Sequence, residues 1–244
     1  IILQYTLGLD IGTSAVKALL MNENGEIIAE NSEEYPLYTP RSGWAEQNPE
    51  DWWKSSKKVI KDLIKENDID NEKISALSFS GQMHSSVFLD ENMEVIRPAI
   101  LWSDTRTSAE CEEIYDRVGG IKELANLVSN PALEGFTAPK ILWLRNNEPD
   151  NFKKLAKVLL PKDYIRYKLS GELGMDLSDA AGTLLCDVEA EDWSEEIMEK
   201  LELDYSIMPP VLKSVEVVGP VTEQAAAETG LSQKDVACCV GTGY

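Results

Sequence analysis

The 244-residue sequence predicts an α/β domain in which helices flank a mixed β-sheet. Three observations favour this class. Strand-like segments joined by tight turns open the chain, a helix with a clear start signal leads into another strand, and a mainly helical block follows from residue 107. Because the order strand, strand, strand, helix, strand requires a crossover connection, we expect both parallel and antiparallel neighbours in the sheet.

The first three strands are expected at residues 6–11, 16–21 and 27–35. Turn-forming residues, 12–14 and 22–25, separate them, and two successive tight connections predict an antiparallel meander. Side-chain alternation places the apolar residues of the first strand on one face and its acid on the other.

The next segment carries the signals of a helix start. Asn48 is expected to cap the helix, Pro49 to occupy its first position, and two acids follow where they favour the positive end of the helix dipole. Apolar residues at helical spacing predict a buried face that includes Trp52 and Trp53. Further strands are expected at residues 74–79 and 87–89.

The block after residue 107 predicts helices that either cover one face of the sheet or form a cap beside it. They are expected at residues 108–118, 121–128, 139–145 and 163–169. A last helix at 223–228 precedes an apolar strand at 236–240, which runs into the turn Gly241-Thr242-Gly243.

Composition excludes several classes of function. Lys and Arg number 23 against 43 Asp and Glu, a formal charge of −20, so nucleic acid and anionic membrane surfaces are not expected partners. The sequence shows neither a membrane-spanning apolar run nor a signal peptide, and its four cysteines lack the spacing of a zinc site. We therefore expect a cytoplasmic protein with buried free thiols. The missing initiator Met and the abrupt glycine-rich end suggest a fragment of a longer polypeptide.

A first candidate site lies at the turn between the first two strands. Asp10 stands at its mouth, and Gly12 permits a tight turn whose amides, with the hydroxyls of Thr13 and Ser14, can hold a phosphate. Asp10 can hold hydrated magnesium, and Lys17 can offset negative charge. The alternative is an ordinary hairpin whose polar side chains satisfy the turn amides, and the segment is not a Walker loop.

A second candidate site surrounds the single histidine of the chain. Gln82 and His84 offer donors and acceptors for hydroxyl groups and Met83 an apolar contact, which suits a sugar, although a lone histidine is more often structural. Trp102 can pack on a ligand, and Asp104 can accept from two hydroxyls. Alternatively, Asp104 pairs with Arg106 or caps the helix near residue 108.

Seven segments in matching order resemble the FGGY carbohydrate kinases, and the last three resemble the xylulokinases within that family. They are Gly8–Ser14, Trp44–Trp53, Gly81–His84, Ile100–Asp104, Gly135–Lys140, Leu160–Tyr164 and Ser178–Thr183. The resemblance implies an actin-like, ribonuclease-H-like fold. It further implies that residues 1–244 form the amino-terminal, sugar-binding domain of a roughly 500-residue enzyme whose carboxy-terminal domain is absent from this chain.

In that family a sugar hydroxyl attacks the γ-phosphate of Mg-ATP in the cleft between the two domains. The resemblance implies that Met83 and His84 contact D-xylulose, with Gln82, Trp102 and Asp104 lining or supporting the sugar pocket. It assigns the metal to Asp10. The residues implied to face the phosphates are Asp10, Gly12, Thr13, Ser14, Lys17, Gly241 and Gly243.

Two positions depart from the family pattern. The glycine-rich turn is usually followed by an aspartate that acts as general base, but Tyr244 stands there, and a phenol with a pKa near 10 accepts protons poorly at neutral pH. No catalytic residue is assigned, and the isolated chain is expected to be inactive. Ser85 replaces a glycine and is expected to add bulk beside the sugar.

Two other functions stay open: a non-catalytic sugar-binding or regulatory module, and a kinase for another ketose or for gluconate. A homodimer is also compatible with the sequence. Because both the chain and the nucleotide are anionic, we expect nucleotide binding to require a divalent ion.

Overall fold

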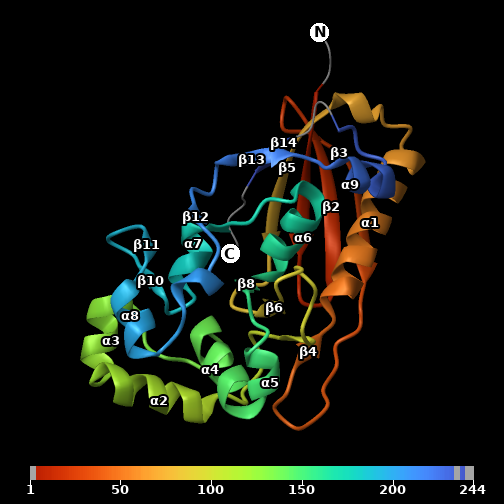
Figure 1. Cartoon of the computed structure of the whole chain (residues 1–244). Helices are drawn as coiled ribbons and strands as arrows, with labels where there is room; N and C mark the ends of the chain where they lie inside the picture. Colours follow the sequence, from red (N-terminus) through yellow and green to blue (C-terminus); the bar gives the residue numbers. More distant parts are fainter. Residues whose placement is uncertain (1–3, 234–236, 240–244) are drawn as a thin grey trace.

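The computed structural model describes residues 4–233 and 237–239 and places helices against one face of a mixed sheet, with a helical lobe beside it (Figure 1). The six described strands of the sheet run in the order β13-β14-β5-β1-β2-β3. Their bounds are β1 Tyr5–Ile11, β2 Ala15–Asn22, β3 Ile27–Glu34, β5 Ile74–Gly81, β13 Val217–Pro220 and β14 Ala237–Cys239.

Strand directions confirm the predicted mixture. β1, β2 and β3 form the antiparallel meander, whereas β5 lies parallel to both β1 and β14. Along β1 the side chains alternate as expected, with Leu7, Leu9 and Ile11 buried and Asp10 exposed. One face of the sheet is therefore apolar and covered, and the other carries the acid.

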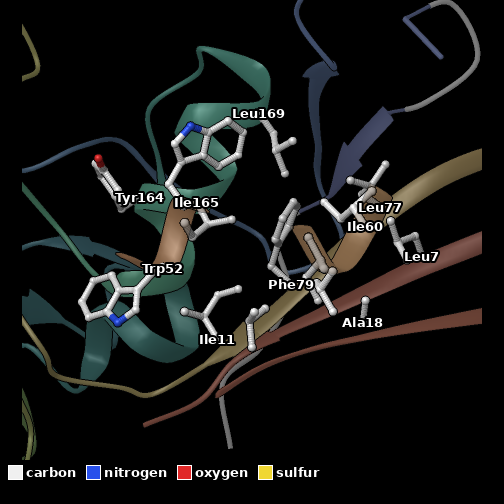
Figure 2. Packing of buried hydrophobic residues seen from close by; sticks show 14 of the residues in the cluster. Leu7, Ile11, Ala18, Trp52, Ile60, Leu77, Phe79, Tyr164, Ile165 and Leu169 are labelled. Atoms are coloured by element: carbon white, nitrogen blue, oxygen red, sulfur yellow. The ribbon is translucent and has the colours of Figure 1, made fainter. Parts of the chain in front are cut away.

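Helix α1 (Pro49–Glu66) covers the apolar face together with α6 (Pro161–Ser170) and α9 (Glu223–Thr229). The predicted cap of α1 is present, because Asn48 Oδ1 accepts from the backbone amide of Glu50 at 3.1 Å. Trp52 and Trp53 are both buried, and Figure 2 shows Trp52 among the apolar side chains of α6 and the sheet. Burial of this face anchors the helices and leaves the carboxyl ends of β1 and β5 accessible.

The remaining helices build a second hydrophobic core in the lobe at the lower left of Figure 1. They are α2 Ser108–Val118, α3 Ile121–Val128, α4 Thr137–Asn147, α5 Pro149–Phe152, α7 Leu177–Ala181 and α8 Glu195–Lys200. The two alternatives for the helical block thus both apply: α6 covers the sheet, whereas α2, α3 and α4 form a separate lobe.

Short strand pairs connect these layers, and most of their members were not predicted. The pairs are β4 Glu46–Gln47 with β7 Ala99–Ile100, β6 Val87–Leu89 with β8 Lys157–Leu159, β9 Met175–Asp176 with β12 Val211–Leu212, and β10 Cys186–Asp187 with β11 Asp192–Trp193. Strand 87–89 was predicted at the right place, but it pairs with β8 outside the main sheet. Short 3₁₀ turns occupy Asn71–Lys73 and Tyr205–Ile207.

In the part of the chain that the structure describes, no helix combines the length and the apolar character that a membrane crossing needs. Cys111 and Cys186 are free and buried, as expected, and the side chains of Cys238 and Cys239 lie outside the description.

Candidate active site

The two candidate sites found in the sequence open onto one cavity of about 380 Å³. Its walls come from the β1–β2 turn, the end of β5 with the loop that follows, and the loop after β7. Parallel pairing brings the first two together, because Ile11 at the end of β1 lies opposite Gly81 at the end of β5. The lining residues are Asp10, Gly12, Thr13, Gly81, Gln82, Met83, His84 and Trp102.

Asp10 is the exposed acid at the hairpin end of this cavity. Its Oδ1 accepts from the hydroxyl of Ser80 at 2.8 Å, and the strand register sets it opposite Lys17 on β2. Asp10 and Lys17 also border a larger concavity of about 750 Å³ over the open face of the sheet. The Asp10 carboxylate thus stands where the open sheet face meets the cavity, whereas Lys17 lines only the larger concavity.

Gly12 shows why the turn needs glycine and where its amide goes. A Cβ at this position would lie 3.1 Å from Ala15 O and 3.7 Å from Asp10 Oδ2, so a side chain would crowd the turn. The Gly12 amide donates to Ala15 O at 3.1 Å, so it is engaged within the hairpin by a backbone carbonyl and not by a polar side chain. The Gly12 carbonyl accepts from the Tyr35 hydroxyl. Any backbone amides that hold a phosphate at this turn must therefore belong to the residues after Gly12.

His84 adopts a left-handed backbone conformation with φ of 63°, which turns its ring toward the cavity. The ring packs on Phe136 at 4.6 Å between centroids, and Nδ1 lies 2.9 Å from the carbonyl oxygen of Gly182. Because a carbonyl only accepts, Nδ1 carries the proton, and the neutral ring keeps Nε2 as an acceptor. Burial, and then the nearby Lys140, lower the pKa of His84 and favour this neutral form.

Lys140 is a functional candidate that the sequence indicates only as the last residue of the segment Gly135–Lys140. Its ammonium group donates to the carbonyl of His84 at 2.9 Å and to that of Gly135, while the side chain is buried. Burial lowers the pKa of Lys140 to about 7. A lysine on the buried face of α4 was the only available signal, because the His84 carbonyl that it contacts lies in another segment, 56 residues away.

Trp102 lines the cavity, and its indole Nε1 donates to the Thr13 hydroxyl at 3.0 Å. Asp104 does not line it. The Asp104 carboxylate is 0% exposed and accepts from Arg106 Nε at 2.9 Å and Nη2 at 2.7 Å, and also from the Ala45 amide. A sugar hydroxyl has no access to Asp104, so the expectation of direct contact is corrected, and the pairing with Arg106 is the alternative that holds.

The expectation that Ser85 adds bulk beside the sugar is also wrong. Ser85 is buried outside the cavity lining, where its hydroxyl donates to Gln82 Oε1 at 2.9 Å and accepts from the Trp102 amide at 3.0 Å. Period-2 alternation after β5 does not continue through the left-handed residue at His84, and this turn directs the Ser85 side chain inward.

A buried ionic cluster that the sequence did not predict stands behind the end of β5. Lys162 Nζ lies 2.7 Å from Asp176 Oδ1, 2.8 Å from Asp179 Oδ2 and 3.1 Å from Asp163 Oδ1. A Cβ on Gly81 would lie 3.3 Å from Lys162 Cβ. The cluster thus packs directly against a residue that lines the cavity.

Ser14 is exposed beside the cavity without appearing in its lining. Gly241, Gly243 and Tyr244 lie outside the described residues, so their predicted places at the phosphates and at the base position carry no structural description.

Comparison with known proteins gives concordant results. A sequence profile described as the FGGY family of carbohydrate kinases, N-terminal domain, matches residues 5–242. The xylulose kinase of Bacillus subtilis (strain 168) is 42% identical over 232 residues, which cover 95% of this chain and 46% of that protein. The chain therefore spans about half the length of the curated relatives it matches.

Solved structures match over nearly the whole chain. A xyloylose kinase from Brucella ovis superimposes with a TM-score of 0.90 at 38% identity, covering 98% of this chain and 49% of that one. A xylulose kinase from Rhodospirillum rubrum gives a TM-score of 0.94 at 28% identity over 98% of this chain and 49% of that one. These neighbours confirm the expected actin-like, ribonuclease-H-like fold. On this evidence the chain belongs to the FGGY family of carbohydrate kinases.

Proposed function

We propose that the full-length protein containing this chain transfers the γ-phosphoryl group of Mg-ATP to D-xylulose, giving xylulose 5-phosphate and ADP. The observation that carries the proposal is the single cavity into which both Asp10 and His84 open. The chain would supply the sugar pocket and the phosphate hairpin, and a carboxy-terminal domain would complete the nucleotide site. This division between two domains is supported by the match to the relatives, because the chain covers only about half of their length.

The sugar side of the cavity suits a polyol. The neutral His84 ring offers Nε2 as an acceptor for a hydroxyl, while Met83 and Trp102 offer apolar surfaces for carbon–hydrogen faces. Gln82 lines the wall, but its amide is already bonded within the protein, so we assign it to shaping the pocket. Asp104 supports the wall through Arg106 and the Ala45 amide.

The hairpin side suits the phosphates. The hydroxyls of Thr13 and Ser14 can donate to phosphate oxygens, and Lys17 offsets their charge. Asp10 fits a hydrated magnesium ion, because its carboxylate is exposed and Gly12 leaves room beside Oδ2 that a Cβ would narrow. When bound, the ion would neutralise charge on the phosphates. Among residues 4–233 and 237–239 no group of three or more acidic, His or Cys side chains could hold a metal, so Asp10 would bind an ion that arrives with the nucleotide.

The attacking hydroxyl must lose its proton to a base, and we assign none within the described residues. In the family pattern the base is an aspartate that follows the glycine-rich turn, and Tyr244 stands at that position in this chain. The isolated chain is therefore proposed to bind the sugar without turning it over. Gly241 and Gly243 remain proposed phosphate contacts.

A substrate panel tests the proposal in the full-length protein. ADP release is measured with ATP and D-xylulose, D-ribulose or D-gluconate, with magnesium or with EDTA, while calorimetry measures sugar binding. We expect the highest kcat/KM for D-xylulose and loss of nucleotide binding in EDTA. A preference for gluconate would identify another kinase of the family, and sugar binding without ADP release would indicate a non-catalytic module.

Asp10 provides the sharpest variant for this test. We expect Asp10→Asn to lower kcat at least about 100-fold while sugar affinity changes less than about threefold, because Asp10 serves the phosphates. Asp116→Asn at an exposed position of α2 is the matched control. Equal activity of the Asp10 variant and the control would reject the assignment of Asp10.

The proposed enzyme works in the cytoplasm, which the buried free thiols of Cys111 and Cys186 support. Light scattering of the full-length protein would distinguish a monomer from a homodimer.

A further inference from the structure

A closed ring of hydrogen bonds links the phosphate hairpin to both walls of the sugar cavity. Gln47 Nε2 donates to Thr13 O at 2.7 Å, and Gln82 Nε2 donates to Gln47 Oε1 at 3.0 Å. The Ser85 hydroxyl donates to Gln82 Oε1 at 2.9 Å and accepts from Trp102 N at 3.0 Å. Trp102 Nε1 then donates to Thr13 Oγ1 at 3.0 Å and closes the ring.

The direction of the bonds in this ring is fixed from outside. Trp52 Nε1 can only donate, and it lies 3.0 Å from Gln47 Oε1, so the oxygen of Gln47 must face it. The Gln47 amide nitrogen then faces Thr13 O, and Gln82 must turn its own nitrogen toward Gln47. That orientation leaves Gln82 Oε1 to accept from Ser85. The Trp52 indole therefore fixes the orientation of both glutamine amides, and with it the role of the Ser85 hydroxyl as donor to Gln82.

Burial stiffens the part of the ring formed by Gln47, Gln82 and Ser85, whereas the bond between Trp102 and Thr13 is exposed. Gln47 is 1% exposed, Gln82 8% and Ser85 0%, so water cannot readily replace a broken bond. The Gln47 amide has its donors and acceptor engaged, since Nε2 also lies 3.3 Å from Pro36 O. Neither Gln47 nor Ser85 lines the cavity. Any effect of these two residues on a bound ligand must therefore pass through the position of their neighbours.

We propose that the ring of Thr13, Gln47, Gln82, Ser85 and Trp102 fixes the separation between the phosphate hairpin and the sugar cavity, so that Gln47 and Ser85 are positioning residues for phosphoryl transfer. The catalytic part of this inference rests on the proposed kinase function. In-line transfer depends steeply on the placement of its reactants, and a displacement of about 1 Å can cost about 100-fold in rate. A ring that spans both subsites meets that requirement.

Hydrogen exchange in the 244-residue chain tests the mechanical link without any activity. Ser85→Ala removes the ring bonds to Gln82 and Trp102 but does not touch the hairpin. We expect amide exchange in residues 11–15 to rise about 3- to 10-fold nevertheless, because one hydrogen bond has been lost from a shared network. Gln47→Met, which removes the amide and keeps the side-chain length, should do the same.

Ser170→Ala is the matched control. Ser170 is also buried, and its hydroxyl also donates one bond, to Arg166 O at 2.9 Å, and accepts one, from the Glu172 amide at 3.2 Å. It should leave exchange in residues 11–15 unchanged. If exchange there is also unchanged in Ser85→Ala and in Gln47→Met, the hairpin is not held by the ring and the inference is overturned.

Kinetics of the full-length protein test the positioning role. We expect Ser85→Ala to lower kcat about 10- to 100-fold, to change the KM for the sugar less than about threefold, and to raise the share of ATP lost to water, because misplaced reactants let hydrolysis compete. A merely structural serine, as in Ser170→Ala, would leave that share unchanged.

The two levels of the inference fail separately. A wild-type protein that phosphorylates no sugar would reject the proposed function and with it the catalytic role, while a rise in hairpin exchange would still establish the link. A kinase whose Ser85→Ala variant keeps the wild-type kcat and the wild-type share of hydrolysis would overturn the positioning role.

Discussion

Individual buried groups set the chemistry of this cavity through atoms that do not line it. Lys140 holds the carbonyl of His84 at 2.9 Å, and Gly182 receives the proton-bearing nitrogen of the same histidine. Both residues lie far from His84 in sequence. The histidine was found from its loop, but its tautomer and its orientation depend on these two distant partners.

The buried Lys140 makes a prediction about pH. Its pKa falls from an ordinary 10.5 to about 7, so between these values the folded chain binds fewer protons than the unfolded chain. Its contribution to stability therefore rises with pH across this interval, by at most about 1.4 kcal/mol per pH unit.

The measurement is the free energy of unfolding in urea from pH 6.5 to 10, compared between the wild type and Lys140→Met. The difference separates the effect of Lys140 from that of its charged and ionisable neighbours, Asp104, Arg106 and Cys111. A difference that stays flat with pH would show that Lys140 keeps its ordinary pKa.

Gly182 is predicted to be irreplaceable for sugar binding. A Cβ there would lie 2.5 Å from His84 Cε1 and 2.8 Å from Nδ1, so Gly182→Ala must displace the ring. We expect at least about a 10-fold loss of D-xylulose affinity by calorimetry, the effect of one lost hydrogen bond with the repacking around it. Gly8→Ala, whose nearest contact is Leu19 O at 3.9 Å, is the control and should bind like the wild type.

At the scale of elements, the long helices and strands were predicted well because residues near their ends mark where each one begins or stops. The helix at Pro49–Glu66 has its cap and proline, and the helix at Ser108–Val118 ends where Gly119 adopts a left-handed φ of 96°. The two-residue strands could not be predicted in this way. The pairing of Glu46 with Ile100 joins segments more than fifty residues apart, and no local pattern encodes it.

The cap of α1 gives an element-scale prediction. Asn48→Ala removes the acceptor for the Glu50 amide and should lower the free energy of unfolding by about 1 kcal/mol, whereas Asn48→Asp should restore most of it. Urea denaturation followed by circular dichroism measures both variants. Equal stability of all three proteins would mean that the cap contributes nothing.

At the scale of the whole molecule, two hydrophobic cores meet at the buried ionic cluster. Lys162 belongs to α6, which packs in the core of the sheet, whereas Asp176 and Asp179 come from β9 and α7 beside the core of the helical lobe. Desolvation opposes ionisation within this cluster and raises the pKa of Asp179 to about 6. Nearby carboxylates in turn raise the pKa of Lys162 despite its burial. The cluster therefore depends on its central cation.

Removal of that cation should be severe. Lys162→Met leaves three buried carboxylates, of which only Asp163 keeps an ion-pair partner among the described residues, Arg166 Nη2 at 3.8 Å. We therefore expect a loss of about 3–5 kcal/mol in urea denaturation. The exposed pair of Lys153 with Asp150, at 2.8 Å, is the comparison, and Lys153→Met should cost less than about 1 kcal/mol. If Lys162→Met lowers the free energy of unfolding no more than Lys153→Met does, the cluster does not depend on Lys162.

Periodicity and turn chemistry were sufficient to place the meander, the capped helix and the two polar loops, since each depends on neighbours within a few residues. Asp10 and His84 could be named for the same reason. The sequence could not show that the Asp104 carboxylate is bound by Arg106 or that the Ser85 side chain points inward. Nor could it show that Gln47 and Lys140 donate hydrogen bonds to residues of the cavity walls. These properties arise from contacts between segments that only chain packing brings together, and burial then decides which polar atoms remain accessible to a ligand.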